Sequence, residues 1–323
     1  MPVLHCTYSA PKWLFNRHIE TIFPYLFRKV EGIVYDRERI NTPDEDFLDL
    51  DWSLTGSKVL VIVCHGLEGS TDRPYIRGMV KAANLAGFDA LAWNFRGCSG
   101  VPNLKLRGYH SGATDDLDWV VRHALKTERY QHIVLVGFSL GANLILKYAG
   151  ENGQNLSETI KGLVAFSAPV NLASSCQSIM QGFNRVYEKS FLNSLIPKMK
   201  HKAQLFPENM NIDLFKKVKR LVDFDNYFTA PIHGFVDACD YYVKCSAKQF
   251  LPAISTPTLI VNAKNDSFLG PECYPVEIAH QYPNIFLEMP SAGGHVAFTS
   301  FEQEGLLWSE MRTVSFIKEQ LSL

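Results

Sequence analysis

The sequence predicts an α/β fold in which a mainly parallel central sheet is flanked by helices on both faces. Apolar β-type runs alternate with helix-like runs along the chain, which is typical of parallel sheets. The runs at 58–66 and 132–139 are almost continuously apolar, as expected of strands covered on both faces. The chain has 323 residues, 46% of them hydrophobic, so it can bury one large core. We therefore expect a single domain over residues 1–323.

The chain opens with an N-terminal arm at 1–32. Its stretch WLFNRHIETIFPYLFRK mixes aromatic and basic residues and predicts a segment packed on the domain. Weak peripheral contact with a membrane surface is the alternative, because amphipathic helices look alike in both settings. Residues 38–54 then alternate apolar and polar side chains, which predicts antiparallel edge strands.

The rest of the chain alternates between strand and helix patterns. Strands are expected at 58–66, 88–97, 132–139, 160–169, 257–266 and 284–290. Helices are expected at 75–87, 114–127, 140–152 and near 309–321. Residues 170–255 interrupt this rhythm with helix-like groupings and no obvious strand. We interpret them as a helical insert before the late strands, a lid or side wall over a site, with a crossover padded by extra helices as the alternative.

Composition and charge exclude several classes of function. The net charge of −1 gives no reason to expect a nucleic-acid partner. The seven cysteines are scattered without a CxxC pair, so they favour a reducing, cytoplasmic location over a disulfide framework. Lys12, Arg17 and His18 interrupt the early apolar residues, so no signal-peptide pattern forms. No apolar run is long enough to span a bilayer.

The stretch VLVGFSLGANLILK raises the possibility of a nucleophile at Ser139. Gly137-Phe138-Ser139-Leu140-Gly141 fits the G-x-S-x-G pattern, with a strand before it and a helix after it. Small residues are needed two positions before and after the serine, because the turn is strained and crowded. The pentapeptide alone is a weak signal, since glycine and serine are common in turns. The flanking pattern makes a nucleophilic serine the favoured interpretation.

A nucleophilic serine needs a histidine base and a carboxylate that orients it. Asp266 follows the fifth of the expected parallel strands, and His295 follows the sixth in SAGGHVAF. Taken alone, such an aspartate is usually a turn residue and such a histidine a loop residue. Their order after Ser139 and their placement on late loops predict a catalytic triad of Ser139, Asp266 and His295.

Two backbone N–H groups are expected to bind the oxyanion. One belongs to Leu140, directly after the serine, and the other to Leu67 in the loop HGLEGS. Cys64 is a rival nucleophile by position, but we interpret it as a buried strand residue. The histidines show no metal-ligand spacing, and no phosphate-binding glycine motif is present. We expect neither a metal nor a cofactor.

At these residues the sequence resembles the α/β-hydrolase superfamily, and within it the YheT-like hydrolases. That group is related to eukaryotic abhydrolase-domain lipases and yeast medium-chain ethyl-ester synthases. The resemblance implies the α/β-hydrolase fold and the same three catalytic residues. One departure is Ser267, where such proteins often have proline. The matching stretches are NRHIETI (16–22), HGLEGSTDRPYI (65–76), NFRGCSG (94–100), YHSGATDDL (109–117), GFSLGANLILKY (137–148), NAKNDSF (262–268) and GGHVAF (293–298).

Together these patterns predict a serine hydrolase that cleaves short- to medium-chain carboxylic esters through an acyl-enzyme. The expected partner is a small-molecule ester. Three alternatives remain open. The acyl group could pass to an alcohol or thiol, the same triad could cleave amides or lactones, or the fold could bind a ligand without catalysis. An intact serine, aspartate and histidine weigh against the last.

Overall fold

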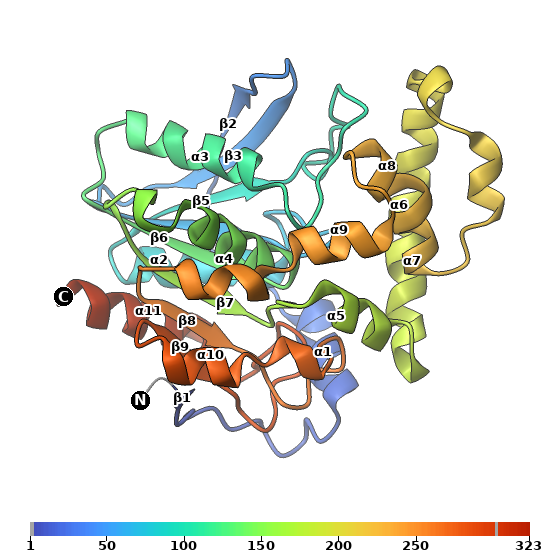
Figure 1. Cartoon of the computed structure of the whole chain (residues 1–323). Coiled ribbons are helices and arrows are strands. Elements are labelled where there is room, and N and C mark those ends of the chain that lie inside the picture. The colour runs from blue at the N-terminus through green and yellow to red at the C-terminus, as the bar shows by residue number, and fades with distance from the viewer. Residues whose placement is uncertain (1–2, 301–302) are drawn as a thin grey trace.

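The computed structural model describes residues 3–300 and 303–323. Its strands are β1 (Val3–Leu4), β2 (Asp36–Asn41), β3 (Phe47–Ser53), β4 (Val59–Cys64), β5 (Asp89–Asn94), β6 (His132–Phe138), β7 (Ile160–Phe166), β8 (Thr258–Val261) and β9 (Ile285–Glu288). In the described residues they form one sheet in the order β1-β9-β8-β7-β6-β4-β5-β3-β2 (Figure 1). Neighbours from β1 to β5 in that order are parallel, and β3 and β2 add an antiparallel edge.

Helices lie between the strands and cover the sheet. They are α1 (Arg17–Phe27), α2 (Pro74–Leu85), α3 (Thr114–Lys126), α4 (Leu140–Asn152), α5 (Leu172–Ile179), α6 (Arg185–Leu205), α7 (Leu221–Phe224), α8 (Ala230–Ile232), α9 (Ala238–Cys245), α10 (Val276–Gln281) and α11 (Trp308–Leu321). The predicted mainly parallel, helix-covered α/β sheet is thus confirmed. The short edge strand β1, which pairs with β9, was not predicted.

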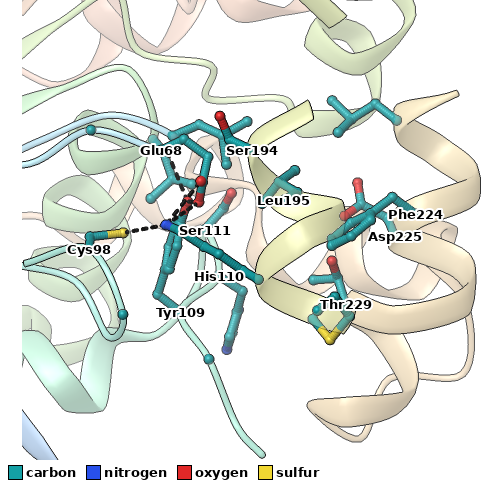
Figure 2. Close-up of a pocket in the computed structure, with 18 of the residues that line it drawn as sticks. Glu68, Cys98, Tyr109, His110, Ser111, Ser194, Leu195, Phe224, Asp225 and Thr229 are labelled. Atoms are coloured by element: carbon teal, nitrogen blue, oxygen red, sulfur yellow. Dashed lines mark hydrogen bonds and ion pairs between the residues drawn. The ribbon is translucent and has the colours of Figure 1, made fainter. Parts of the chain in front are cut away.

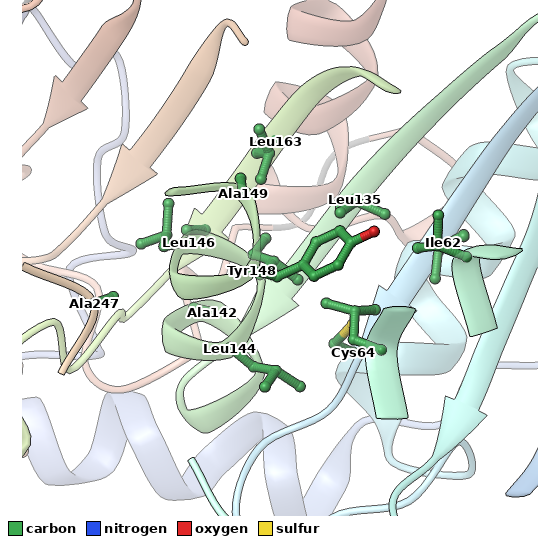
Figure 3. Packing of buried hydrophobic residues seen from close by; sticks show 14 of the residues in the cluster. Ile62, Cys64, Leu135, Ala142, Leu144, Leu146, Tyr148, Ala149, Leu163 and Ala247 are labelled. Atoms are coloured by element: carbon green, nitrogen blue, oxygen red, sulfur yellow. The ribbon is translucent and has the colours of Figure 1, made fainter. Parts of the chain in front are cut away.

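The core explains why the central strands are continuously apolar. In β4, alternate residues from Leu60 to Cys64 pack in one cluster with α3, α4 and α10 (Figure 3). The intervening residues from Val59 to Val63 pack in a second cluster with α2 and α11. Successive side chains of a strand point to opposite faces, so a strand buried on both faces needs apolar residues at every position. Cys64 is fully buried, as expected.

Residues 170–255 leave the sheet after β7 and return to it at β8. They contain α5 to α9 and, in the structure, no strand. Their apolar side chains form a separate cluster that includes Leu192, Phe224 and Phe228. In Figure 1 the helices α6, α7 and α8 stand to one side of the sheet. A lid or side-wall role for this segment remains a prediction.

The N-terminal arm contains a capped helix. Asn16 begins α1, because its side chain accepts a hydrogen bond from the His18 N–H, and Pro24 lies inside the helix. Among the described residues, no helix combines the length and the apolar character needed to cross a bilayer.

Candidate active site

The three residues predicted for a triad converge at the carboxyl edge of the sheet. Ser139 follows β6, Asp266 follows β8 and His295 follows β9. The Ser139 Oγ lies 2.9 Å from Nε2 of His295. The other ring nitrogen, Nδ1, lies 2.9 Å and 3.1 Å from the two carboxylate oxygens of Asp266. This is the hydrogen-bond series that a base-activated nucleophile requires.

The turn around Ser139 is strained in the way the glycine spacing predicts. Ser139 has φ 53° and ψ −118°, a conformation that side-chain-bearing residues rarely adopt. A Cβ at Gly137 would lie 2.4 Å from the carbonyl oxygen of Gly141. A Cβ at Gly141 would lie 2.5 Å from the carbonyl oxygens of Cys64 and His65. Only glycine fits at both positions, so the serine is held at the sharp junction of β6 and α4.

Packing orients the histidine and the aspartate. Asp266 is 3% exposed, and its Oδ1 also accepts the N–H of Phe268 at 2.9 Å. The Phe268 ring stacks on the His295 imidazole, with ring centroids 4.1 Å apart and planes 20° apart. Sequence reasoning missed Phe268, because an aromatic residue in a loop carries no signal of what it will cover.

The loop after β4 approaches the serine closely and supplies an N–H that has no partner among the described residues. Gly66 approaches closely, since a Cβ there would lie 3.2 Å from the Cβ of Ser139. The N–H of Gly66 donates to the hydroxyl of Tyr75, and the N–H of Glu68 donates to the hydroxyl of Tyr109. Between them, the N–H of Leu67 has no hydrogen-bond partner in the described part of the chain.

The N–H of Leu140 is likewise without a partner among residues 3–300 and 303–323, because it begins helix α4. Both N–H groups predicted for the oxyanion are therefore available to bind one, next to a helix N-terminus that favours negative charge.

The buried residue His65 stabilises the conformation of the loop after β4. His65 is fully buried, and burial lowers its pKa to about 3, so the imidazole is neutral. Its Nε2 accepts the N–H of Phe95 at 3.1 Å, so Nδ1 carries the proton and donates to the carbonyl of Gly66 at 2.7 Å. His65 thus ties this loop to the end of β5.

A pocket of about 770 Å³ opens at Ser139 and His295. Residues of two glycine-rich loops, at 94–100 and 109–116, contribute to its wall. Residues 170–255 supply further apolar side chains, among them Leu172, Ile179, Leu221 and Phe224. A mostly apolar cavity that carries a few polar groups is the usual form of a small-molecule site.

An ion pair connects the loop after β4 to helix α6 within this pocket. The ammonium of Lys198, on α6, lies 2.9 Å from Oε2 of Glu68, and the Tyr109 hydroxyl donates to Oε1 of the same carboxylate at 2.7 Å (Figure 2). The Lys198 ammonium is also 3.6 Å from Sγ of Cys98. The sequence holds no signal for this pair, because its partners lie 130 positions apart.

Asp225 places a buried carboxyl group in the wall of the pocket. Its Oδ2 accepts the hydroxyl of Tyr242 at 2.6 Å, and no basic side chain of the described residues pairs with it. Burial raises the pKa of Asp225 from 3.8 to about 6, because the charged form loses its hydration.

We expect Asp225→Asn to stabilise the protein at pH 8 but not at pH 4. The folded-state pKa is above the unfolded value, so between pH 3.8 and about 6 the unfolded chain ionises while the folded chain keeps its proton. Stability is therefore lost as pH rises through that window, by about 3 kcal/mol at most. Melting temperatures of both proteins at the two pH values measure the effect. Asp213→Asn, at an exposed position, serves as control, and a difference independent of pH would contradict the prediction.

The N-terminal arm leaves large apolar side chains in solvent. Trp13, Phe15, Leu26 and Phe27 are all exposed, Phe15 by 82%. The arm also packs on the domain, since Glu20 is buried. Packing on the domain is thus observed, while weak contact of the exposed face with a membrane surface remains a prediction.

The amino-acid sequence is similar to those of known proteins. The family model described as alpha/beta hydrolase fold matches residues 59–301. The YheT protein of Escherichia coli, whose name proposes an esterase, is 37% identical over 289 residues, 88% of this chain and 84% of that protein. Phospholipase ABHD3 of Mus musculus is 27% identical over 310 residues, 92% of this chain and 74% of that protein.

A solved structure gives a similar result for the fold. The esterase Pf2001 of Pyrococcus furiosus superposes with a TM-score of 0.58 at 19% identity, covering 91% of this chain and 98% of that one. At this identity the likeness concerns the fold alone.

Proposed function

The chain belongs to the α/β-hydrolase fold family, and from that premise we propose that it cleaves carboxylic esters through Ser139, His295 and Asp266. The relatives named as an esterase and a phospholipase support ester hydrolysis as its reaction class. The observation that carries the proposal for these residues is the unbroken hydrogen-bond series from Asp266 through His295 to Ser139.

In the first half of the reaction, Oγ of Ser139 attacks the ester carbonyl while Nε2 of His295 takes its proton. Asp266 holds the N–H of Nδ1 and stabilises the imidazolium that forms. The negative charge on the former carbonyl oxygen is bound by the N–H groups of Leu67 and Leu140. The imidazolium then protonates the departing alcohol, which leaves an acyl group on Ser139.

In the second half, water takes the place of the alcohol. Nε2 of His295 removes a proton from this water, which attacks the acyl carbonyl. The same two N–H groups bind the second oxyanion. Return of the proton to Oγ of Ser139 releases the carboxylic acid and restores the starting state.

The proposed substrates are esters of short- to medium-chain acids, because apolar side chains of 170–255 line the pocket. We expect kcat/KM on p-nitrophenyl esters to rise from acetate toward decanoate until the pocket is filled. Each methylene that leaves water contributes about 0.8 kcal/mol, or up to about fourfold in kcat/KM. A burst of p-nitrophenol before steady state would reveal the acyl-enzyme.

Two phenylalanine substitutions test whether this pocket holds the acyl chain. Leu172→Phe narrows the pocket and should shift the preferred acid to a shorter chain, whereas Leu205→Phe, on the exposed surface of α6, should not. Equal kcat/KM for all chain lengths would contradict the assigned acyl pocket. Absence of turnover with every ester would contradict the proposed reaction.

A further inference from the structure

Helix α1 contacts both loops that carry the proposed acid and base. The Glu20 carboxylate accepts the backbone N–H of Gly293 at 2.6 Å. It also accepts the side-chain amide of Asn265, with Nδ2 3.1 Å and 3.2 Å from its two oxygens. Asn265 directly precedes Asp266, and Gly293 lies two positions before His295. One side chain of the N-terminal arm therefore bridges the two loops.

The neighbouring residue, Thr21, holds the histidine itself. Its hydroxyl accepts the backbone N–H of His295 at 2.9 Å and donates to the carbonyl of Arg17 at 2.8 Å. Between these contacts, the N–H of Gly294 donates to Oδ1 of Asn265 at 3.1 Å. Three successive N–H groups, at 293, 294 and 295, are thus bound by Glu20, Asn265 and Thr21.

The backbone of the histidine loop needs such support. Gly294 has φ 59° and Val296 has φ 63°. Positive φ is costly for a β-branched residue, and such a backbone persists only where its surroundings hold it. Gly294 also fits closely against α1, since a Cβ there would lie 2.8 Å from Oγ1 of Thr21. Besides α1, the contact from Val296 N–H to the Ser167 hydroxyl holds this loop.

The burial of Glu20 makes these contacts obligatory. The residue is 3% exposed, and no basic side chain in the part of the chain described pairs with it. A buried carboxylate is costly unless hydrogen-bond donors surround it. Its donors here are the Gly293 backbone and the Asn265 amide, so the carboxylate and the two loops hold one another in place.

We propose that Glu20 and Thr21 are positioning residues, which hold the loops of Asp266 and His295 so that the imidazole reaches both Asp266 and Ser139. The inference rests on the proposed function, because it acts through His295. Helix α1 lies outside residues 59–301, which match the family model. The arm is therefore inferred to complete the catalytic geometry from outside the residues that match the family model.

The test uses Thr21→Val, which removes the hydroxyl at nearly constant volume, and Thr21→Ser, which restores it. Thr127→Val is the matched control, because the Thr127 hydroxyl also donates to a backbone carbonyl but lies at the end of α3. Glu20→Gln is paired with Asp89→Asn, whose buried carboxylate binds the N–H groups of residues 55–57 at the opposite end of the sheet. Each full-length protein is compared by kcat, KM and melting temperature.

We expect Thr21→Val and Glu20→Gln to lower kcat by about 10²-fold, with KM nearly unchanged, because displacement of a catalytic group by about 1 Å has this effect. Thr21→Ser should recover most of the lost kcat. The two controls should keep wild-type kcat even where they melt earlier. The inference is overturned if kcat falls no further in the α1 variants than in the controls while Ser139→Ala is inactive. If Ser139→Ala remains active, the proposed function itself fails.

Discussion

Ser139→Ala is expected to abolish ester turnover, with kcat lower by about 10⁵- to 10⁶-fold. The substitution removes the only atom of this residue that can form the acyl-enzyme, and His295 Nε2, 2.9 Å away in the native protein, is left with no proton to take. Residual catalysis would come from binding and from the two N–H groups at Leu67 and Leu140. Because alanine is smaller and the site is half-buried, the protein should fold normally.

Covalent labelling gives a direct check of this result. A fluorophosphonate should label the wild-type protein, and peptide mapping should find the label on Ser139 alone. Ser139→Ala should not be labelled, whereas Ser315→Ala, in the exposed part of α11, should label normally. A folded Ser139→Ala protein that hydrolyses esters within tenfold of the wild-type rate would eliminate Ser139 as the nucleophile.

Asp266→Asn is expected to lower kcat by about 10⁴-fold. In the native protein the carboxylate accepts a hydrogen bond from the Nδ1–H of His295 at 2.9 Å, so Nε2 carries no proton and faces Ser139 as a base. An amide can turn its NH₂ group to Nδ1, which favours the opposite tautomer and removes the base. The side-chain oxygen of the new asparagine can still accept the hydrogen bond from the Phe268 N–H, so we expect little change in the fold.

The measurement for Asp266→Asn combines kinetics with a melting curve. We expect KM close to the wild-type value and a melting temperature within a few degrees of it. Glu272→Gln is the control. Glu272 is an exposed residue six positions after Asp266 that pairs with Lys248, so this variant should keep wild-type kcat. A kcat within tenfold of wild type in Asp266→Asn would show that another group orients the histidine.

Local patterns were sufficient to predict the fold. The central strands had to be apolar at every position because helices cover both faces, and this made β4 and β6 recognisable. Ser139 was recognisable because the turn admits only glycine at 137 and 141. The short β1 was not predicted, because two residues carry no periodicity and its pairing with β9 joins the two ends of the chain.

The support of the site could not be predicted from such patterns. Glu20 and Thr21 act on residues more than 240 positions away, and a glutamate and a threonine in an amphipathic helix look like surface residues. The ion pair of Glu68 and Lys198 also joins residues that are far apart in the chain, so no local pattern predicts it. No local rule would place Val296 at positive φ, because a β-branched residue adopts it only when tertiary contacts compensate the strain.

Local patterns predict the succession of strands and helices along the chain, the serine turn and the loops that hold Asp266 and His295. These features follow from side-chain periodicity and steric limits between near neighbours. Tertiary packing sets how the imidazole reaches both Asp266 and Ser139, which side chains line the pocket and how the N-terminal arm contacts the loops of Asp266 and His295. Those outcomes depend on hydrogen bonds and packing between distant segments, which exist only once the chain has folded.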